Sequence, residues 1–464
     1  MFLFEMLDNS ILNVALPTIG RDVHASTAGL QWVTSSYAVL YGGMMMAFGA
    51  LADRIGRRKM MLFGLLLLGA TSLATPLVRT LPQLIVLRSA MGIAASMTTP
   101  GSLALAFRLF DEDRLRVRAT TLISTVGLVG LAIGPTVGGF VLAIAPWQSL
   151  LLVNVPTAAI SFVGIARGIP ADKADELHDE PIDIPGALLG TTTIMCALVA
   201  PTFFVDLGMH SVLPWATLSG AALLAVLFAL REHATDHPLL DVKLVAQPLV
   251  SSGLAFKAAA GLATASLGYL VTLQLQLAWA WTPAQAAMGM LPQVVVLIAG
   301  GAIIDPLIRK VGIEKASWLC AAATVCGLAV YTLLGHFGYA WVVVALVLVA
   351  GGMRVVGVVA GTNVLRGLPK DRITTGAAMV DTASELATGI GIAVSGTILA
   401  ALFTGDVAAI PWTAAQGAEF TKAVTIAGIA VTGIAAGLVG WGVAQSRRGT
   451  DSPTMSSGSG TGVG

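Results

Sequence analysis

The chain has little charge, because Lys, Arg, Asp and Glu make up only 11% of its 464 residues. A soluble domain carries about 25%. Hydrophobic residues account for 56% and the mean hydropathy is +0.84. This composition excludes an ordinary soluble protein and predicts a polytopic, all-α membrane protein in contact with the lipid bilayer. The net charge of +1 gives no global field that would favour nucleic acid, so we expect no nucleic-acid partner.

Several kinds of site are also missing. The cysteines, Cys196, Cys320 and Cys326, lie inside apolar runs, so neither a disulfide framework nor metal-ligand spacing is visible. No G-x-x-x-x-G-K-[ST] stretch is present, which excludes a built-in P-loop ATPase. We find no nucleophile–base constellation. We therefore expect neither an enzyme nor a cofactor or metal, and any energy source must be an ion gradient or a separate subunit.

The N-terminal segment from Met1 to Pro17 has no basic start and no cleavage site, so it is not a signal peptide. At about 1.5 Å per residue it reaches about 25 Å, short of a hydrocarbon core of about 30 Å. We expect that this first helix is clipped or that its true start lies upstream.

Apolar runs of membrane-spanning length divide the chain into fourteen segments. They cover roughly residues 1–17, 32–52, 60–78, 82–107, 119–143, 149–167, 186–205, 212–230, 250–277, 285–304, 316–335, 341–364, 375–403 and 422–444. Most of the 26 basic residues fall in alternate loops, on the side of the loop at 49–59. Because basic loops stay in the cytoplasm, this bias predicts fourteen transmembrane helices with both termini cytoplasmic.

The loop Gly49-Ala-Leu-Ala-Asp-Arg-Ile-Gly-Arg-Arg-Lys59 joins two of these segments. It resembles the major facilitator superfamily signature G-x-L-A-D-R-x-G-R-[KR]. An ordinary basic loop explains its cations but neither Asp53 nor its glycines. The resemblance implies two six-helix bundles that rock about a central cavity, with this loop as a gate latch. The implied gating residues are Gly49, Asp53, Arg54, Gly56 and Arg57.

A second loop, at residues 301–312, resembles the first, with Asp305 in place of Asp53. Such an internal repeat is typical of transporters built from two parallel halves. We therefore predict two halves separated by two inserted helices. The predicted domains are an N-terminal bundle at 1–170, a linker with the inserted helices at 171–248, a C-terminal bundle at 249–446 and a disordered cytoplasmic tail at 447–464.

Asp8 lies in the apolar first segment, about 14 Å from Pro17. Charged groups inside a bilayer are costly and are functional candidates by default. The stretch from Leu7 to Pro17 resembles the motif L-D-x-T-x-x-N-V-A-L-P of fourteen-helix drug:proton antiporters, with Ser10 replacing Thr. That resemblance implies that Asp8 binds protons and substrate. The alternative is that Asp8 only pairs with a basic neighbour.

Arg88 lies in the fourth segment at about the same depth as Asp8, so we expect the two to meet. Its surroundings resemble the superfamily motif L-x-x-x-R-x-x-Q-G, with Met91 in place of Gln. The resemblance implies a role in proton coupling, and the alternative is a structural clamp.

The fifth segment contains a glycine-rich stretch, Gly130-Leu-Ala-Ile-Gly-Pro-Thr-Val-Gly-Gly139. Small residues allow close helix packing. The stretch matches G-x-x-x-G-P-x-x-G-G, which the superfamily associates with antiporters. The motif residues are Gly130, Gly134, Pro135, Gly138 and Gly139.

The second half also has charges inside apolar segments. Asp381 and Glu385 lie four residues apart on one face of a predicted helix. Arg354 lies at a similar depth to Glu385, and we predict that they pair. Acids in a cavity suit a cationic drug as well as a proton, so Glu385 is a candidate for substrate binding and all three for proton coupling. The alternative is a buried salt bridge that only orients helices.

Together the motifs imply a proton-coupled antiporter that exports cationic or lipophilic drugs by alternating access. They place it in a bacterial cytoplasmic membrane, with small-molecule substrate and protons as partners, and we expect a monomer. One alternative is a dedicated exporter of a single metabolite or self-made antibiotic. The other is a receptor or channel that transports nothing.

Overall fold

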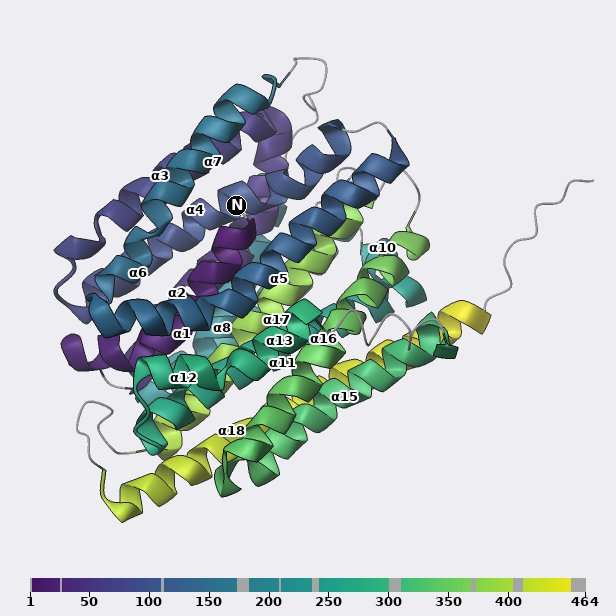
Figure 1. Cartoon of the computed structure of the whole chain (residues 1–464). Coiled ribbons are helices and arrows are strands. Elements are labelled where there is room, and N and C mark those ends of the chain that lie inside the picture. The colour runs from purple at the N-terminus through teal and green to yellow at the C-terminus, as the bar shows by residue number, and fades with distance from the viewer. Residues whose placement is uncertain are drawn as a thin grey trace, which may run out of the picture.

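The structure is a bundle of long helices (Figure 1). This computed structural model describes residues 2–25, 27–109, 112–172, 183–207, 210–235, 242–299, 310–368, 373–403 and 412–451. Its helices up to residue 245 are α1 Phe2–Asp22, α2 Thr27–Ile55, α3 Arg57–Leu73, η1 Thr75–Leu77, α4 Leu81–Leu109, α5 Asp113–Ile144, α6 Gln148–Leu152, α7 Asn154–Gly168, α8 Ile184–Leu207, α9 Val212–Ala234 and α10 Val242–Val245. Beyond it are α11 Pro248–Leu273, η3 Gln274–Ala278, α12 Pro283–Gly289, α13 Leu291–Ala299, α15 Ile313–Leu334, η4 Gly335–Phe337, α16 Tyr339–Gly367, α17 Ile373–Leu402 and α18 Ala414–Asp451.

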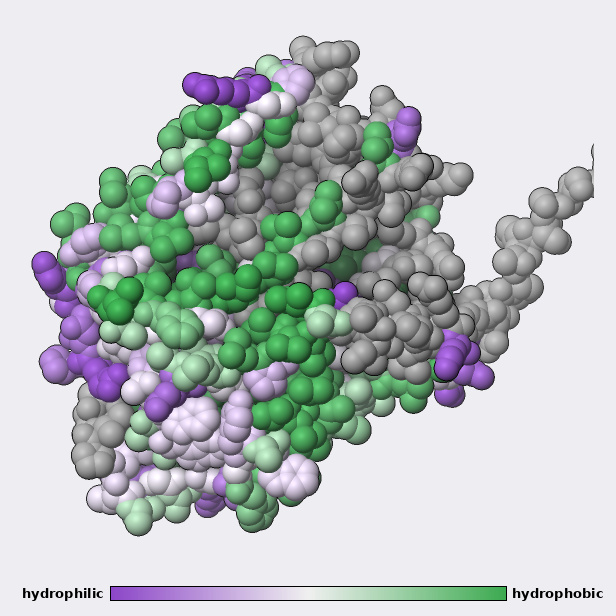
Figure 2. Space-filling view, viewed as in Figure 1, coloured by the Kyte–Doolittle hydropathy of each residue, from purple (hydrophilic) through white to green (hydrophobic). Residues whose placement is uncertain are grey.

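The composition of these helices suits a bilayer. Within the described ranges, 8 helices are long and apolar enough to cross a membrane, and shorter apolar helices accompany them. Large apolar side chains face outward, among them Ile144 at 89% and Val212 at 80% exposure. Figure 2 shows a broad apolar band across the viewed face. Because soluble monomers rarely expose so much apolar surface, this surface indicates contact with lipid. The predicted all-helical membrane class is confirmed.

The first helix is longer than predicted. α1 has 21 residues and continues past Pro17 to Asp22, which corresponds to about 31 Å. The indole Nε1 of Trp147 donates to Asp22 Oδ2 at 2.7 Å and holds this end of the helix. The predicted length of about 25 Å was therefore too short. At the other end of the chain, α18 reaches Asp451, past the predicted start of the tail at 447. Residues 452–464 of that tail lie outside the described residues.

Two predicted segments are interrupted. The segment at 149–167 divides at Val153 into α6 and α7. The segment at 285–304 contains α12 and α13 with a break at Met290. Before it, α11 ends in the π-helical turn η3. The division at Val153 matters for the site, because it places Asn154 in the first turn of α7.

Helices near in sequence pack together, and a few contacts join the first part of the chain to the last. α1 packs along α5, α2 along α4, and α3 against α4 and α7. In the last part, α11 contacts α16, α17 and α18. The two parts meet where α2 contacts α17, α5 contacts α12 and α13, and α1 contacts α11.

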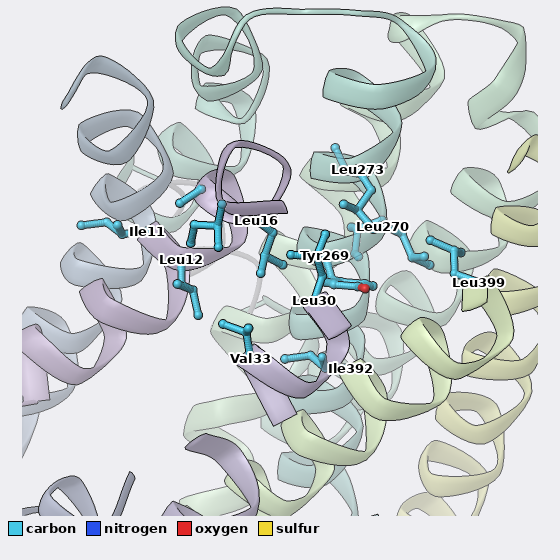
Figure 3. Close-up of a cluster of buried hydrophobic side chains, with 14 of the residues drawn as sticks. Ile11, Leu12, Leu16, Leu30, Val33, Tyr269, Leu270, Leu273, Ile392 and Leu399 are labelled. Carbon is cyan, nitrogen blue, oxygen red and sulfur yellow. The ribbon is translucent and has the colours of Figure 1, made fainter. Parts of the chain in front are cut away.

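A hydrophobic cluster lies where the two parts meet (Figure 3). Its buried members from α1, α2, α11 and α17 include Leu12, Leu16, Leu30, Val33, Leu270, Leu273, Ile392 and Leu399. Burying one such side chain contributes about 1.5–3 kcal/mol. Several of these residues lie in the last turns of α1, α11 and α17, so the cluster joins the two parts near the end where α1 stops, which we call the Asp22 end. The opposite end, where α2 meets α3, is the Gly56 end.

The helices α8 and α9 pack on each other, and α8 also contacts α2 and α17. Asp183 joins the two helices at the Gly56 end. Its Oδ1 accepts from the backbone N–H of Gly186 at 3.1 Å and from Arg231 Nη2 at 3.0 Å. Burial raises the pKa of Asp183, but the hydrogen bonds from Arg231 and Gly186 outweigh burial and leave that pKa below its ordinary value.

Candidate functional site

Asp8 and Arg88 form a buried ion pair between α1 and α4. Arg88 Nη1 donates to Asp8 Oδ2 at 2.6 Å, which confirms the predicted contact. Asp8 is 5% exposed and Arg88 is fully buried. A buried pair of this kind is strongly destabilised when one partner is removed, because the other charge remains without compensation. The site therefore depends on both residues.

A third residue, Asn154, completes the coordination of the carboxylate. Asn154 Nδ2 on α7 donates to Asp8 Oδ1 at 3.0 Å. Asn154 is itself buried. Each carboxylate oxygen thus accepts from a different helix, and Asp8 ties α1 to α4 and α7. Sequence reasoning missed Asn154, although a carboxamide two residues before Pro156 in an apolar run was a visible signal.

Aromatic rings from α2 cover the guanidinium. The Arg88 Cζ atom lies 4.3 Å from the centroid of the Tyr37 ring, a cation–π geometry. Tyr41 stacks on Tyr37 with 5.7 Å between ring centroids. Gly92 permits this approach, since a Cβ there would lie 2.6 Å from the Tyr37 carbonyl oxygen. Among the described residues, Arg88 Nε and Nη2 have no hydrogen-bond partner, so the guanidinium is held mainly by Asp8 and the ring.

In the last part of the chain, a half-buried arginine of α16 has a different partner. Arg354 on α16 donates through Nη1 to the backbone carbonyl of Leu297 on α13. Glu385 is buried on α17. The predicted Arg354–Glu385 pair stays a prediction, and the hydrogen bond that the structure shows for Arg354 goes to α13, which packs on α16. Asp381 lies in α17, but its side chain is outside the described part.

The basic loop contacts the end of α7. Gly56 has φ 107° and precedes α3. The backbone N–H of Arg58 donates to Asp172 Oδ2 at 3.1 Å, and Arg58 Nη2 donates to the Ala166 carbonyl at 2.6 Å. A Cβ on Gly56 would lie 2.4 Å from Asp172 Oδ2. Glycine at this position therefore serves both the backbone conformation and the close approach of Asp172.

The other predicted gating residues are only partly described. Gly49 and Arg54 lie in α2, with Arg54 exposed in its last turn, and Arg57 begins α3. The side chain of Asp53 and the whole of Asp305 lie outside the described residues.

The glycines of the fifth segment lie in α5, which continues through Pro135. Gly130, Gly134 and Pro135 are buried. A Cβ on Gly138 would lie 3.4 Å from Ile11 of α1. On Gly139 it would lie 2.4 Å from the Ala287 Cβ of α12. The last two glycines therefore let α5 approach both the helix of Asp8 and a helix of the second half.

Comparison with known proteins places the chain in a family. The family description "Major Facilitator Superfamily" matches residues 1–392. The chain belongs to the Major Facilitator Superfamily.

Curated relatives agree with this assignment. The methyl viologen resistance protein SmvA of Salmonella typhimurium is 29% identical over 86% of this chain and 81% of its own length. The drug efflux pump JefA of Mycobacterium tuberculosis is 31% identical over 85% of this chain and 78% of its own length. The cephamycin export protein CmcT of Amycolatopsis lactamdurans is 30% identical over 69% of this chain and 66% of its own length.

Solved structures show the same fold. A peptide transporter POT in complex with sulfate has a TM-score of 0.66 at 15% identity, covering 96% of this chain and 94% of that one. A bacterial homolog of the human lysosomal transporter Spinster has a TM-score of 0.65 at 14% identity, covering 96% of this chain and 95% of that one. This superfamily member is therefore a multi-pass membrane transporter and not an enzyme. The receptor or channel alternative is not supported.

Proposed function

We propose that the chain is a proton-coupled antiporter that exports cationic or lipophilic drugs or antibiotics across the bacterial cytoplasmic membrane by alternating access. One observation carries this proposal: the Asp8 carboxylate is buried between the Arg88 guanidinium and the Asn154 carboxamide.

Such a carboxylate suits proton coupling for a physical reason. A charged acid in a low-dielectric interior is stable only while its donors hold it. Proton binding to Asp8 removes its charge and weakens the bond to Arg88, so proton occupancy biases how α1 and α4 pack. The guanidinium is then the cation that changes partner, while Asn154 keeps Asp8 in position.

Substrate binding involves Asp8 and Glu385 in this proposal. Glu385 is 9% exposed on α17, the helix that packs on α2 of the first half. A carboxylate near the meeting of the halves attracts a cation at low dielectric. Competition between protons and drug at Asp8 gives antiport, with Glu385, Asp381 and Arg354 as further coupling candidates.

We also propose fourteen transmembrane crossings arranged as six, two and six, with both termini cytoplasmic and the chain acting as a monomer. The proposed units are 1–170, 171–248, 249–446 and a tail from 447. The packing of α1 to α7 among themselves, and of α11 to α18, supports the two bundles. The basic loop around Gly56 supports a cytoplasmic Gly56 end, because positive loops remain inside.

A dedicated exporter of one compound is the second candidate. It is favoured by the relative named for cephamycin export. A panel of ethidium, methyl viologen and several antibiotics separates the two, because a dedicated exporter moves one of them at most.

Efflux of ethidium and methyl viologen from energised, pump-deficient cells tests the proposal. The native chain is compared with Asp8→Asn, with and without a protonophore. Asp22→Asn is the matched control, because Asp22 is exposed at the end of the same helix and bonds Trp147.

We expect the native chain and Asp22→Asn to export and Asp8→Asn to fail, with protonophore abolishing all export. Export that persists in the protonophore contradicts proton coupling. No export of any compound in the panel by the native chain contradicts the drug-efflux assignment.

A further inference from the structure

The π-helical turn η3 presents two buried glutamines at the Asp22 end of the molecule. The backbone N–H of Trp279 donates to the carbonyl of Gln274 at 3.0 Å, a span of five residues instead of four. A π-turn inserts one residue into an α-helix and is frequent at functional sites. Here it follows α11, one of the helices that meet the first half.

The two glutamines use the same chemistry on different partners. Gln276 Nε2 donates to the backbone carbonyl of Val14 on α1 at 2.8 Å. Gln274 Nε2 donates to the backbone carbonyl of Gly335 at 2.9 Å. Their exposures are 5% and 6%. Gln276 therefore bonds across the two parts of the chain, whereas Gln274 bonds within the last part.

The bond of Gln276 is held at some cost. Its Oε1 atom is buried and has no hydrogen-bond partner in the described part of the chain. An unsatisfied buried acceptor disfavours the state that contains it. When the helices separate, water reaches this atom and removes the cost. The free-energy difference between the closed and open arrangements is therefore smaller than the apolar contacts alone would make it.

The apolar neighbours explain why a polar bond matters here. Leu16, Leu270 and Leu273 belong to the cluster that joins α1 and α2 to α11 and α17 (Figure 3). Apolar contacts are non-directional. The Gln276–Val14 bond is directional and fixes which turn of η3 faces α1.

We propose that Gln276 is a positioning residue for transport, acting as a polar latch that closes the Asp22 end and releases when the two parts separate. The latch rests on the proposed alternation between two halves, but not on protons or on any particular drug.

The test measures the distance between spin labels on the two parts at the Asp22 end. Labels are placed at Leu77→Cys, between α3 and α4, and at Ala415→Cys, at the start of α18, in a background with the native cysteines replaced. Leu77 is 76% exposed and Ala415 is also exposed, so labels at both sites are tolerated. The protein is purified into lipid nanodiscs without substrate, so the result is independent of transport specificity.

The variant is Gln276→Glu, with Gln274→Glu as the matched control. An ionised glutamate removes the donor and places negative charge against a carbonyl. Distances are recorded at about pH 8 and about pH 3.5, because a glutamate is protonated below its ordinary pKa of about 4.3 and can then donate again. The native chain at both pH values gives the baseline.

We expect the long-distance population of Gln276→Glu to rise about tenfold over the native chain at the higher pH and to return toward native at the lower pH. Gln274→Glu should give the same distance distribution as the native chain at both pH values. Equal opening by the two variants, or no opening by Gln276→Glu, overturns the proposal. If Gln276→Glu does not fold, Gln276→Asn, which is one methylene shorter and neutral, replaces it with the same expected opening but no pH reversal.

Discussion

Arg88 and Arg354 are both arginines inside apolar helices, one in each half, yet the structure treats them differently. Arg88 is fully buried, paired with Asp8 and covered by Tyr37. Arg354 is only half-buried and donates to a backbone carbonyl of its own half. The first half thus contains a buried charge pair, and in the proposed mechanism a proton changes its balance. In the second half, Arg354 has an acceptor that cannot be protonated at physiological pH. The difference indicates that these two arginines do different chemistry.

The largest expected effect separates the two arginines. Arg88→Gln should reduce transport about 100-fold, because removing one charged partner of a buried pair costs about 3–5 kcal/mol. The neutral carboxamide also loses the cation–π contact with Tyr37. Arg354→Gln should change transport less than about threefold, since a carboxamide still donates to a carbonyl. Initial transport rates in everted membrane vesicles measure both effects. Equal losses of transport rate in the two variants would contradict the proposed difference between the two arginines.

A smaller effect is expected at Asn154. Asn154→Ala removes a hydrogen bond to a charged group, worth about 1.5–3 kcal/mol, and should slow transport at least about tenfold. Asn363→Ala in α16 is a comparison variant, because there the carboxamide donates to the Ser252 hydroxyl at 3.4 Å. That change should leave the rate within about twofold, since the contact is long and neutral. A loss as large as that of Asn154→Ala would contradict the account.

Glu385→Gln tests whether the acid on α17 binds cations or drives coupling. If the acid of the second half binds cations and does not drive coupling, the variant should raise KM for methyl viologen by about tenfold. The response of kcat to the proton gradient should remain. Loss of the response to the gradient with unchanged KM would move the coupling role to the second half.

The smallest effect is expected at the pair that joins α8 and α9, in which Asp183 is buried and Arg231 is partly exposed. Arg231 is 45% exposed in its bond to Asp183, so Asp183→Asn should lower stability by about 1 kcal/mol at most. Because the folded-state pKa of Asp183 is lowered, this contribution is present above the ordinary pKa of about 3.9 and is lost as pH falls through the folded value. Thermal unfolding of the native chain and of Asp183→Asn, near neutral pH and in acid, checks this prediction. A larger destabilisation by Asp183→Asn in acid than near neutral pH would contradict it.

Much of the site was predictable from the first half of the sequence. The position of Asp8 and Arg88 at similar depth was enough to predict their contact, because helix rise converts residue number into depth. The all-helical class followed from charge depletion and apolar runs. The same depth argument did not predict the bond of Arg354 to the Leu297 carbonyl, because equal depth does not say which neighbouring helix the side chain faces.

Other features needed three-dimensional contacts. Asn154 is neutral, and its role depends on the break at Val153 and on α7 reaching α1. The fit of Asp172 against Gly56 joins residues more than a hundred positions apart. The π-turn at Gln276 has no composition signal that separates it from the α-helix before it.

The central claim is that Asp8 exchanges its proton for substrate. The most direct measurement adds methyl viologen or ethidium to purified protein in weakly buffered detergent solution and records released protons with a pH dye. The account predicts release by the native chain and by Glu385→Gln at saturating drug, and none by Asp8→Asn. Equal release by Asp8→Asn would contradict the account and place the coupling proton elsewhere.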